Sequence, residues 1–407
     1  MKSASDLLLV AAQIVVIVAV TWLCGWLLQR LRQPRVVGEI AGGLLLGPLA
    51  LGHLLPAASA RLFPAGQLGG LEMVSQAGLV LFLFLVGMEV DLDVARTNRG
   101  ATLAITVGSI AAPFCLGAAI APALLARFGQ PHGAKVGFVL FVGIAMSITA
   151  LPVLARILAE RRGTSRAVDA ATASVALICA AGNDLVAWSL LAVTLAIMHG
   201  GGAGGTGLRL ALLVALVALM LLLVRPALAQ LADRRTRRMW IWVPAMVLLA
   251  FGTARITETL GVHAFFGAFL AGVCAPRREA LVQMLERALR PVVWIALPVF
   301  FAMTGLRMQR EMFSMMGLGW LAVVLLVAVA GKIGGAALTA KAGGLSWKRA
   351  VEIGVLLNTR GLVELVVLNV GFREGILGPV LFTIFVLMAI VTTGMTVPLL
   401  DLLERRV

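Results

Sequence analysis

The stretch from residue 170 to residue 199 reads AATASVALICAAGNDLVAWSLLAVTLAIMH, and the ten residues on either side of Asn183 and Asp184 are apolar or small. A carboxylate near the centre of a bilayer costs at least about 2.5–3.5 kcal/mol on insertion scales, so it usually faces a cavity. A lone acid at this depth can hold a cation or a proton, but not both. That competition favours a role in coupled transport. The alternative is an acid that a neighbouring helix neutralises for packing.

The composition of the whole chain agrees with a membrane location. Of its 407 residues, 61% are hydrophobic and 13% are charged, whereas about 25% of the residues of a soluble protein are charged. Apolar runs of about 20 residues recur from end to end, and this length spans a bilayer core. Only helices and closed barrels satisfy their backbone there, and these runs are too uniformly apolar for barrel strands. The sequence therefore predicts an all-α, polytopic membrane protein.

We expect about thirteen transmembrane segments in one membrane domain over residues 1–407, without a soluble regulatory domain. The loops of one side hold 23 Lys and Arg residues and those of the other side hold 9. By the positive-inside rule the richer side is cytoplasmic, which predicts an external N-terminus and a cytoplasmic C-terminus in a bacterial inner (plasma) membrane. The net charge of +15 then reflects topology and contact with lipid, and we expect no nucleic-acid partner. The expected segments are residues 6–28, 36–52, 70–88, 101–126, 136–159, 168–198, 208–230, 240–260, 262–275, 289–306, 314–340, 350–371 and 377–400.

The chain carries an internal repeat whose order is preserved. Three pairs of similar motifs are separated by 225, 218 and 211 residues. They relate segments 2–6 to segments 9–13, and this odd shift of seven inverts the second copy in the membrane. Inverted repeats with interrupted helices near the midplane are the architecture of secondary transporters. We expect the repeats over about 36–198 and 262–400, linking helices over about 208–260, and an extra first helix. The paired motifs are residues 42–48 with 267–272, 82–88 with 300–306, and 147–152 with 358–363.

One interruption is predicted at Ser147-Ile-Thr149-Ala-Leu-Pro152. Proline removes an amide donor from a helix and clashes with the preceding turn. The hydroxyl groups of Ser147 and Thr149 can satisfy the freed backbone groups or coordinate a dehydrated cation. Both interpretations stay open at this point.

The partner interruption is Asn358-Thr359-Arg360-Gly361, which puts a charge and a glycine where a membrane helix should be smooth. Glu364 lies four residues beyond Arg360, on the same helical face. The two side chains either neutralise each other structurally or bind substrate. The unwound backbone would offer carbonyl oxygens to a monovalent cation.

Lys332 is a further charge inside an apolar segment, in the run Ala-Val-Ala-Gly-Lys-Ile-Gly-Gly of residues 328–335. Its small neighbours let another helix come close, and a buried ammonium needs an anion. Our hypothesis is that Lys332 pairs with Asp184 until an incoming cation displaces it. The alternative is a lysine that extends to the membrane surface, which its central position argues against.

These motifs together resemble the monovalent cation:proton antiporter superfamily, in its second branch. GEIAGGLLLGP at residues 38–48 is similar to the opening signature of Kef-type transporters. SITALPVLARIL at 147–158, the pair at 183–184, VHAFFGAFLAG at 262–272 and NTRGLVE at 358–364 are most similar to plant-type cation/proton exchangers and their bacterial relatives. The resemblance covers nearly the whole chain.

The resemblance implies a thirteen-helix fold, a homodimer and elevator-type alternating access that exchanges a monovalent cation for protons. By motif match, Asp184 would bind the cation and the proton in turn, Lys332 would be its basic partner, and Thr149 and Asn183 would neighbour the site. No part of this sequence matches the Kef gating domain, so gating by nucleotide or glutathione is not expected. We expect no enzymatic activity, because no Ser-His or paired-Asp constellation appears, and no cofactor beyond the transported ions.

Several alternatives remain. One carboxylate that alternates between one cation and one proton predicts electroneutral exchange, unless Lys332 also releases a proton. Selectivity between K⁺ and Na⁺ depends on the coordination of the ion, and the resemblance favours K⁺ with Na⁺ close behind. A cation channel and a transport-dead membrane sensor are the other candidate functions. The sequence identifies no regulatory subunit and no physiological direction of transport.

Overall fold

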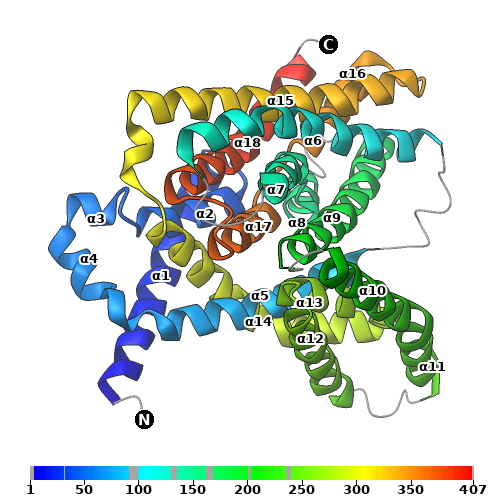
Figure 1. The fold of residues 1–407 in the computed structure, drawn as a ribbon, viewed down its shortest axis with the longest axis horizontal. Coiled ribbons are helices and arrows are strands. Elements are labelled where there is room, and N and C mark those ends of the chain that lie inside the picture. The colour runs from blue at the N-terminus through cyan, green and yellow to red at the C-terminus, as the bar shows by residue number, and fades with distance from the viewer. Residues whose placement is uncertain are drawn as a thin grey trace. The chain divides into compact units, whose positions relative to one another are not determined.

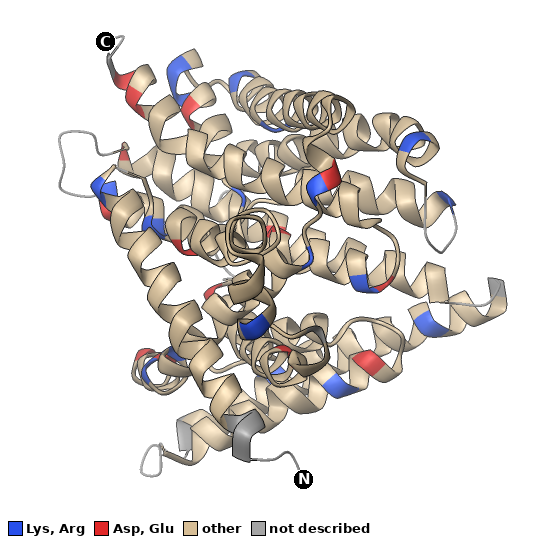
Figure 2. Ribbon diagram, turned by 90° about the vertical axis from the view of Figure 1, so that its left-hand side faces the viewer, with Lys and Arg blue, Asp and Glu red and all other residues tan. Residues whose placement is uncertain are grey.

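The computed structural model describes residues 4–31, 33–90, 100–129, 135–161, 168–199, 203–234 and 240–405, and every regular element in these ranges is a helix. Within this part of the chain, nine helices are long and apolar enough to cross a membrane. Most of the ribbon in Figure 2 is uncharged, as this composition requires. The chain is an integral membrane protein of the predicted all-α class.

The chain forms two compact units. The first comprises Met1–Gln67, Leu92–Ala187 and Phe301–Val407, and the second comprises Leu68–Asp91 and Trp188–Phe300. Two long helices contribute to both units, namely α9 (Ala170–His199) and α14 (Glu279–Leu306).

The first unit contains most of the helices labelled in Figure 1. Besides parts of α9 and α14, its helices are α1 (Ala4–Arg30), α2 (Arg35–Leu45), α3 (Leu51–Leu54), α4 (Pro56–Leu62), α6 (Ala101–Phe128), α7 (Lys135–Ser147), α8 (Leu151–Arg161), α15 (Met315–Ala342), α16 (Trp347–Leu357), α17 (Leu362–Arg373) and α18 (Pro379–Arg405), with 3₁₀ turns at Ala65–Gln67 and Arg310–Phe313.

The second unit holds α5 (Gly69–Glu89), α10 (Ala203–Leu219), a π-helical turn (Met220–Val224), α11 (Arg225–Arg234), α12 (Trp242–Thr259) and α13 (Ala264–Val273). Helices α5 and α13 pack closely because Gly87 and Gly272 face each other's backbone. Small residues of this kind let membrane helices approach without a side chain between them. The indole of Trp188 stacks on Phe269 with ring centroids 6.2 Å apart.

The two predicted interruptions are confirmed. The fifth expected segment is the pair α7 and α8, broken between Ser147 and Leu151, and the twelfth is the pair α16 and α17, broken between Leu357 and Leu362. All other expected segments correspond to helices in the same order. This arrangement of about thirteen segments with two interrupted helices is the predicted architecture.

Two of the expected boundaries differ most from the structure. The second segment was expected to reach residue 52, but α2 ends at Leu45, because Pro48 disfavours a helical conformation at Gly47 and lacks a backbone donor. The tenth segment was expected to begin at residue 289, but α14 begins at Glu279. Its first turns are charged on one side and apolar on the other, so hydropathy alone underestimates the length of the helix.

Helix α15 lies against α6 along much of its length, and the two run side by side in Figure 1. The contact depends on two glycines of α15. A Cβ atom at Gly331 would lie 2.8 Å from the Cα atom of Pro113, and one at Gly335 would lie 2.6 Å from the Cβ atom of Ala112. Because Lys332 lies between these glycines, the close packing fixes the position of its backbone.

We expect the substitution Gly335→Val to lower the free energy of unfolding by about 1–3 kcal/mol, the usual cost of overpacking. The physical reason is the clash with α6. Gly334→Val is the matched control, because a Cβ atom there meets no atom of the described structure within 4 Å. Thermal unfolding of the purified variants in detergent measures the difference, and equal midpoints for the two would contradict the assigned role of Gly335.

Candidate functional site

The two interrupted helices cross at their breaks and bond to each other directly. The amide of Ala150 donates to the carbonyl of Thr359 at 3.0 Å. The hydroxyl of Thr149 donates to the carbonyl of Leu357, the last residue of α16, at 2.8 Å. Each break therefore satisfies backbone groups that the other leaves free.

Two cationic side chains bind the free carbonyl groups at the end of α7. Arg360 donates to the carbonyls of Ala145 and Met146 at 2.7 and 2.5 Å, and the ammonium of Lys332 donates to the carbonyl of Ser147. The last carbonyls of a helix have no partner within the helix and carry a partial negative charge. Both cations are fully buried, so Lys332 does not extend to an exposed surface.

Arg360 also forms an ion pair with Glu364. The guanidinium and carboxylate groups are 3.1 Å apart, and both side chains are fully buried. Glu364 lies in the first turn of α17, where the partial positive charge of the helix favours an acid. The direct pairing that the sequence left as one of two alternatives is thus present in the structure. The backbone amide of Arg360 donates to the hydroxyl of Thr393 in α18, at 3.2 Å.

Asp184 is fully buried in α9, and its carboxylate meets the beginning of α8. The amide of Leu151 donates to its Oδ2 atom at 3.4 Å. An acid at a helix N-terminus is favoured by the helix dipole. The ammonium of Lys332 lies within range of electrostatic interaction with the charges of Asp184, Arg360 and Glu364. Two acids and two bases are therefore gathered in the interior of the first unit.

Asn183 connects the acid-bearing helix to the α7–α8 break. Its amide nitrogen donates to the hydroxyl of Thr149 at 3.0 Å and to that of Ser109 in α6 at 3.1 Å. The hydroxyl of Ser147, by contrast, donates to Ile144 of its own helix at 2.9 Å. Hence Thr149 lies between Asn183 and the other break, whereas Ser147 contributes its carbonyl to Lys332.

The structure adds polar residues that the sequence analysis did not select. Ser109 contacts Asn183, and Thr393 and Thr396 of α18 contact the α16–α17 break through Arg360 and Thr359. Their only signal in the sequence was a hydroxyl group inside an apolar run. Asn358 caps the end of α16 and is fully buried.

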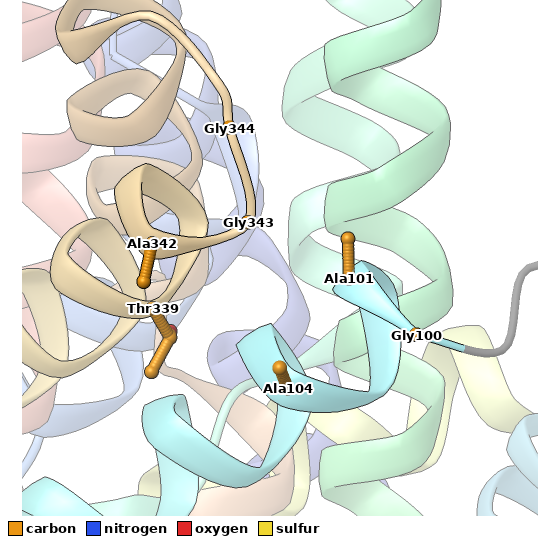
Figure 3. A pocket seen from close by; sticks show the side chains of 7 residues that line it. All are labelled: Gly100, Ala101, Ala104, Thr339, Ala342, Gly343 and Gly344. Carbon is orange, nitrogen blue, oxygen red and sulfur yellow. The ribbon is translucent and has the colours of Figure 1, made fainter.

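This arrangement can hold a monovalent cation or a proton among buried oxygen atoms. Within the described ranges, no three His, Cys, Asp or Glu side chains gather as a multivalent metal site would require. A pocket of about 570 Å³ lies elsewhere in the first unit, between the beginning of α6 and the end of α15 (Figure 3). It is lined by small, uncharged residues, so its chemistry is unsuited to ion coupling. Those residues are Gly100, Ala101, Ala104, Thr339, Ala342, Gly343 and Gly344.

We expect Arg360→Met to lower the free energy of unfolding by about 3–5 kcal/mol, the usual result of removing one partner of a buried pair. The substitution strands Glu364 and two carbonyls of α7. Adding Glu364→Gln to it should recover part of the loss, because it removes the unpaired charge. Thermal unfolding of the single and double variants tests this. A single variant as stable as the wild type would show that the pair does not support the break.

Known proteins with similar sequences bear on this site. The sequence matches the family described as sodium/hydrogen exchanger, transmembrane, over residues 16–402. It is 36% identical to the Na(+)/H(+) antiporter NhaS4 of Synechocystis sp. over 97% of both chains. It is 35% identical to Cation/H(+) antiporter 19 of Arabidopsis thaliana and 31% identical to K(+)/H(+) antiporter 1 of Saccharomyces cerevisiae, over 98% of this chain in each case. It spans about half of those two relatives, covering 50% and 47% of their lengths.

The fold is also that of a solved structure. The sodium proton antiporter MjNhaP1 from Methanocaldococcus jannaschii superposes with a TM-score of 0.70 at 14% sequence identity, over 98% of this chain and 96% of that one. The architecture predicted from the two interruptions is thereby confirmed. The family match covers nearly all of the chain, including both breaks and Asp184, and so the chain belongs to the sodium/hydrogen exchanger family.

Proposed function

We propose that this protein is a secondary active antiporter that exchanges a monovalent cation, K⁺ or Na⁺, for protons. The observation that carries the proposal is the fully buried carboxylate of Asp184 at the N-terminus of the half-helix α8. Relatives that are named Na⁺/H⁺ and K⁺/H⁺ antiporters support the same activity.

In the proposed cycle Asp184 binds the cation and the proton alternately. An ionised Asp184 attracts a cation into the crossing, where the hydroxyl of Thr149 and the carbonyls of the unwound segments offer further oxygen ligands. Protonation of Asp184 removes the charge that holds the cation and releases it. Asn183 positions Thr149 for this role through its hydrogen bond.

Lys332 acts in this cycle as the counter-charge of Asp184. When no cation is bound, the ammonium of Lys332 neutralises the carboxylate of Asp184. A bound cation neutralises the carboxylate instead and displaces the ammonium. The contact between Lys332 and the carbonyl of Ser147 supports this role, because from the break the ammonium needs only a short movement to approach or leave Asp184. Arg360, Glu364 and Thr359 hold the other break in shape.

Alternating access in this proposal is of the elevator type. The two breaks, α9 up to Ala187, and the helices that contact them all belong to the first unit, which supports movement of the site as one body. We further propose a homodimer, as the resemblance to the monovalent cation:proton antiporter superfamily implies. With one carboxylate per protomer as carrier, the exchange is one cation for one proton and moves no net charge.

The first test is proton movement in everted membrane vesicles. Addition of KCl or NaCl to vesicles with an acidified lumen should dequench an acridine dye, and Asp184→Asn should reduce the signal to that of empty vesicles. Dissipating the membrane potential should leave the wild-type rate unchanged if exchange is electroneutral. The salt that works best identifies the cation.

Asp169→Asn provides the matched control, because this acid precedes the same helix and is half exposed beside Arg349. It should retain wild-type exchange. Retention of exchange in Asp184→Asn would exclude Asp184 as the carrier. A silent wild type between pH 6.5 and 9 would favour a channel or a transport-dead sensor instead.

The proposed orientation has its own test, because it predicts opposite sides for two exposed positions. Single cysteines at Gly204 and Lys348 are introduced after the native Cys24, Cys115, Cys179 and Cys274 are replaced. A membrane-impermeant maleimide should label Gly204→Cys in intact cells and Lys348→Cys only after permeabilisation. The reverse pattern would overturn the external N-terminus.

A further inference from the structure

Asn358 has unsatisfied hydrogen-bonding groups in the interior of the protein. Its side chain is fully buried, and neither its Oδ1 nor its Nδ2 atom has a hydrogen-bond partner among the described residues. A primary amide has two donors and an acceptor oxygen with two lone pairs. Leaving such a group unpaired is unfavourable, so a buried example in a native protein points to a bound water or ion.

The position of Asn358 at the crossing is fixed on both sides. The preceding carbonyl, of Leu357, accepts the hydroxyl of Thr149, and the following carbonyl, of Thr359, accepts the amide of Ala150. The next residue, Leu151, donates to Asp184. The free amide therefore belongs to a segment that is bonded to Thr149 and Ala150, and the residue that follows these two bonds to the acid.

The charges around the two breaks favour a cation near Asn358. Lys332 and Arg360 bind the carbonyl end of α7. At the carbonyl end of α16, Leu357 instead accepts the neutral hydroxyl of Thr149. A helix C-terminus carries a partial negative charge, and half-helix C-termini with unwound carbonyls coordinate monovalent cations in transporters.

We propose that the side-chain oxygen of Asn358 is a direct ligand of the transported monovalent cation, an inference that rests on the exchange function proposed above. The amide supplies a neutral oxygen next to the negative end of α16, across the crossing from Asp184. Hard monovalent cations bind such oxygen atoms, and the cation satisfies the group that the protein leaves free.

A neutral ligand has a kinetic signature that a merely structural residue lacks. Cation and proton compete at Asp184, but only the cation uses Asn358. Loss of the amide therefore weakens cation binding without changing proton binding. The apparent KM for the cation rises by the same factor at every pH, and the maximal rate is retained. A residue that acts by changing the proton affinity of Asp184 would instead raise the apparent KM by a factor that changes with pH.

The test compares Asn358→Leu with the wild type, because leucine has a similar volume and no polar atom. In everted vesicles we expect the apparent KM for the preferred cation to rise at least about fivefold between pH 7 and 9, since a hydrogen bond or ligand to a charged group contributes about that much or more. In the purified Asn358→Leu variant, the chloride salt of the cation should raise the midpoint of thermal unfolding above that in choline chloride. It should do so only at higher concentrations than the wild type needs. Without cation, the variant should be at least as stable as the wild type.

Asn369→Leu is the control, because this buried amide in α17 is hydrogen-bonded to Arg307, Thr304 and the carbonyl of Leu365. It should lose stability and keep the wild-type KM. If Asn358→Leu does not fold, Asn358→Ser, which keeps an oxygen atom, should show a smaller rise in KM than Asn358→Ala.

An unchanged KM and an unchanged cation-dependent midpoint in the Asn358 variants would show that the amide holds only water, and would overturn the proposal while leaving the exchange function intact. A wild type that neither exchanges nor is stabilised by cation would overturn both proposals.

Discussion

The binding of the carbonyl end of α7 by Arg360 and Lys332 is the interaction on which the rest of the site depends. A helix that stops inside a membrane leaves polar backbone groups where no water can reach them, and each unsatisfied group costs several kcal/mol. Two buried cations from α15 and the second break satisfy three of these carbonyls. They stabilise the end of α7 at Ser147 and thereby the crossing with α16 and α17.

These cations in turn require anions, and the structure supplies them at helix N-termini. Asp184 meets α8 and Glu364 lies in the first turn of α17. The charges of Asp184, Glu364, Lys332 and Arg360 sum to zero when all four are ionised. In the proposed cycle a proton on Asp184 and a cation beside its ionised carboxylate each add one positive charge to this set, so that exchanging one for the other leaves the charge of the site unchanged. Exchange then follows from the electrostatics of a dry interior, in which an unbalanced charge is costly.

Much of this could be predicted from the sequence, because membranes impose strong patterns. The breaks at 147–152 and 358–361 were predicted from proline, glycine and charge in apolar segments, and the spacing of Arg360 and Glu364 made their pairing one of two alternatives. The partners across the crossing could not be predicted. The sequence did not indicate that Lys332 would bind the Ser147 carbonyl, nor that Ser109 and Thr393 would face the breaks. Those contacts depend on helix rotation and on packing at Gly331 and Gly335, which hydropathy does not encode. The early start of α14 was missed because its first turns are amphipathic.

Much of the polarity of the crossing comes from main-chain groups, namely the carbonyls of residues 145–147, 357 and 359 and the amides of residues 150 and 151. Backbone groups are present whatever the side chains are, so point substitutions leave them in place as long as the helices still break there. A relative can therefore differ from this chain at most positions, as the Synechocystis antiporter does at 36% identity, without losing these groups wherever its helices break at the same places. In the exchange proposed above, the ion preference is set by the few side chains that enter this framework, so that very few mutations are needed to change the preferred ion.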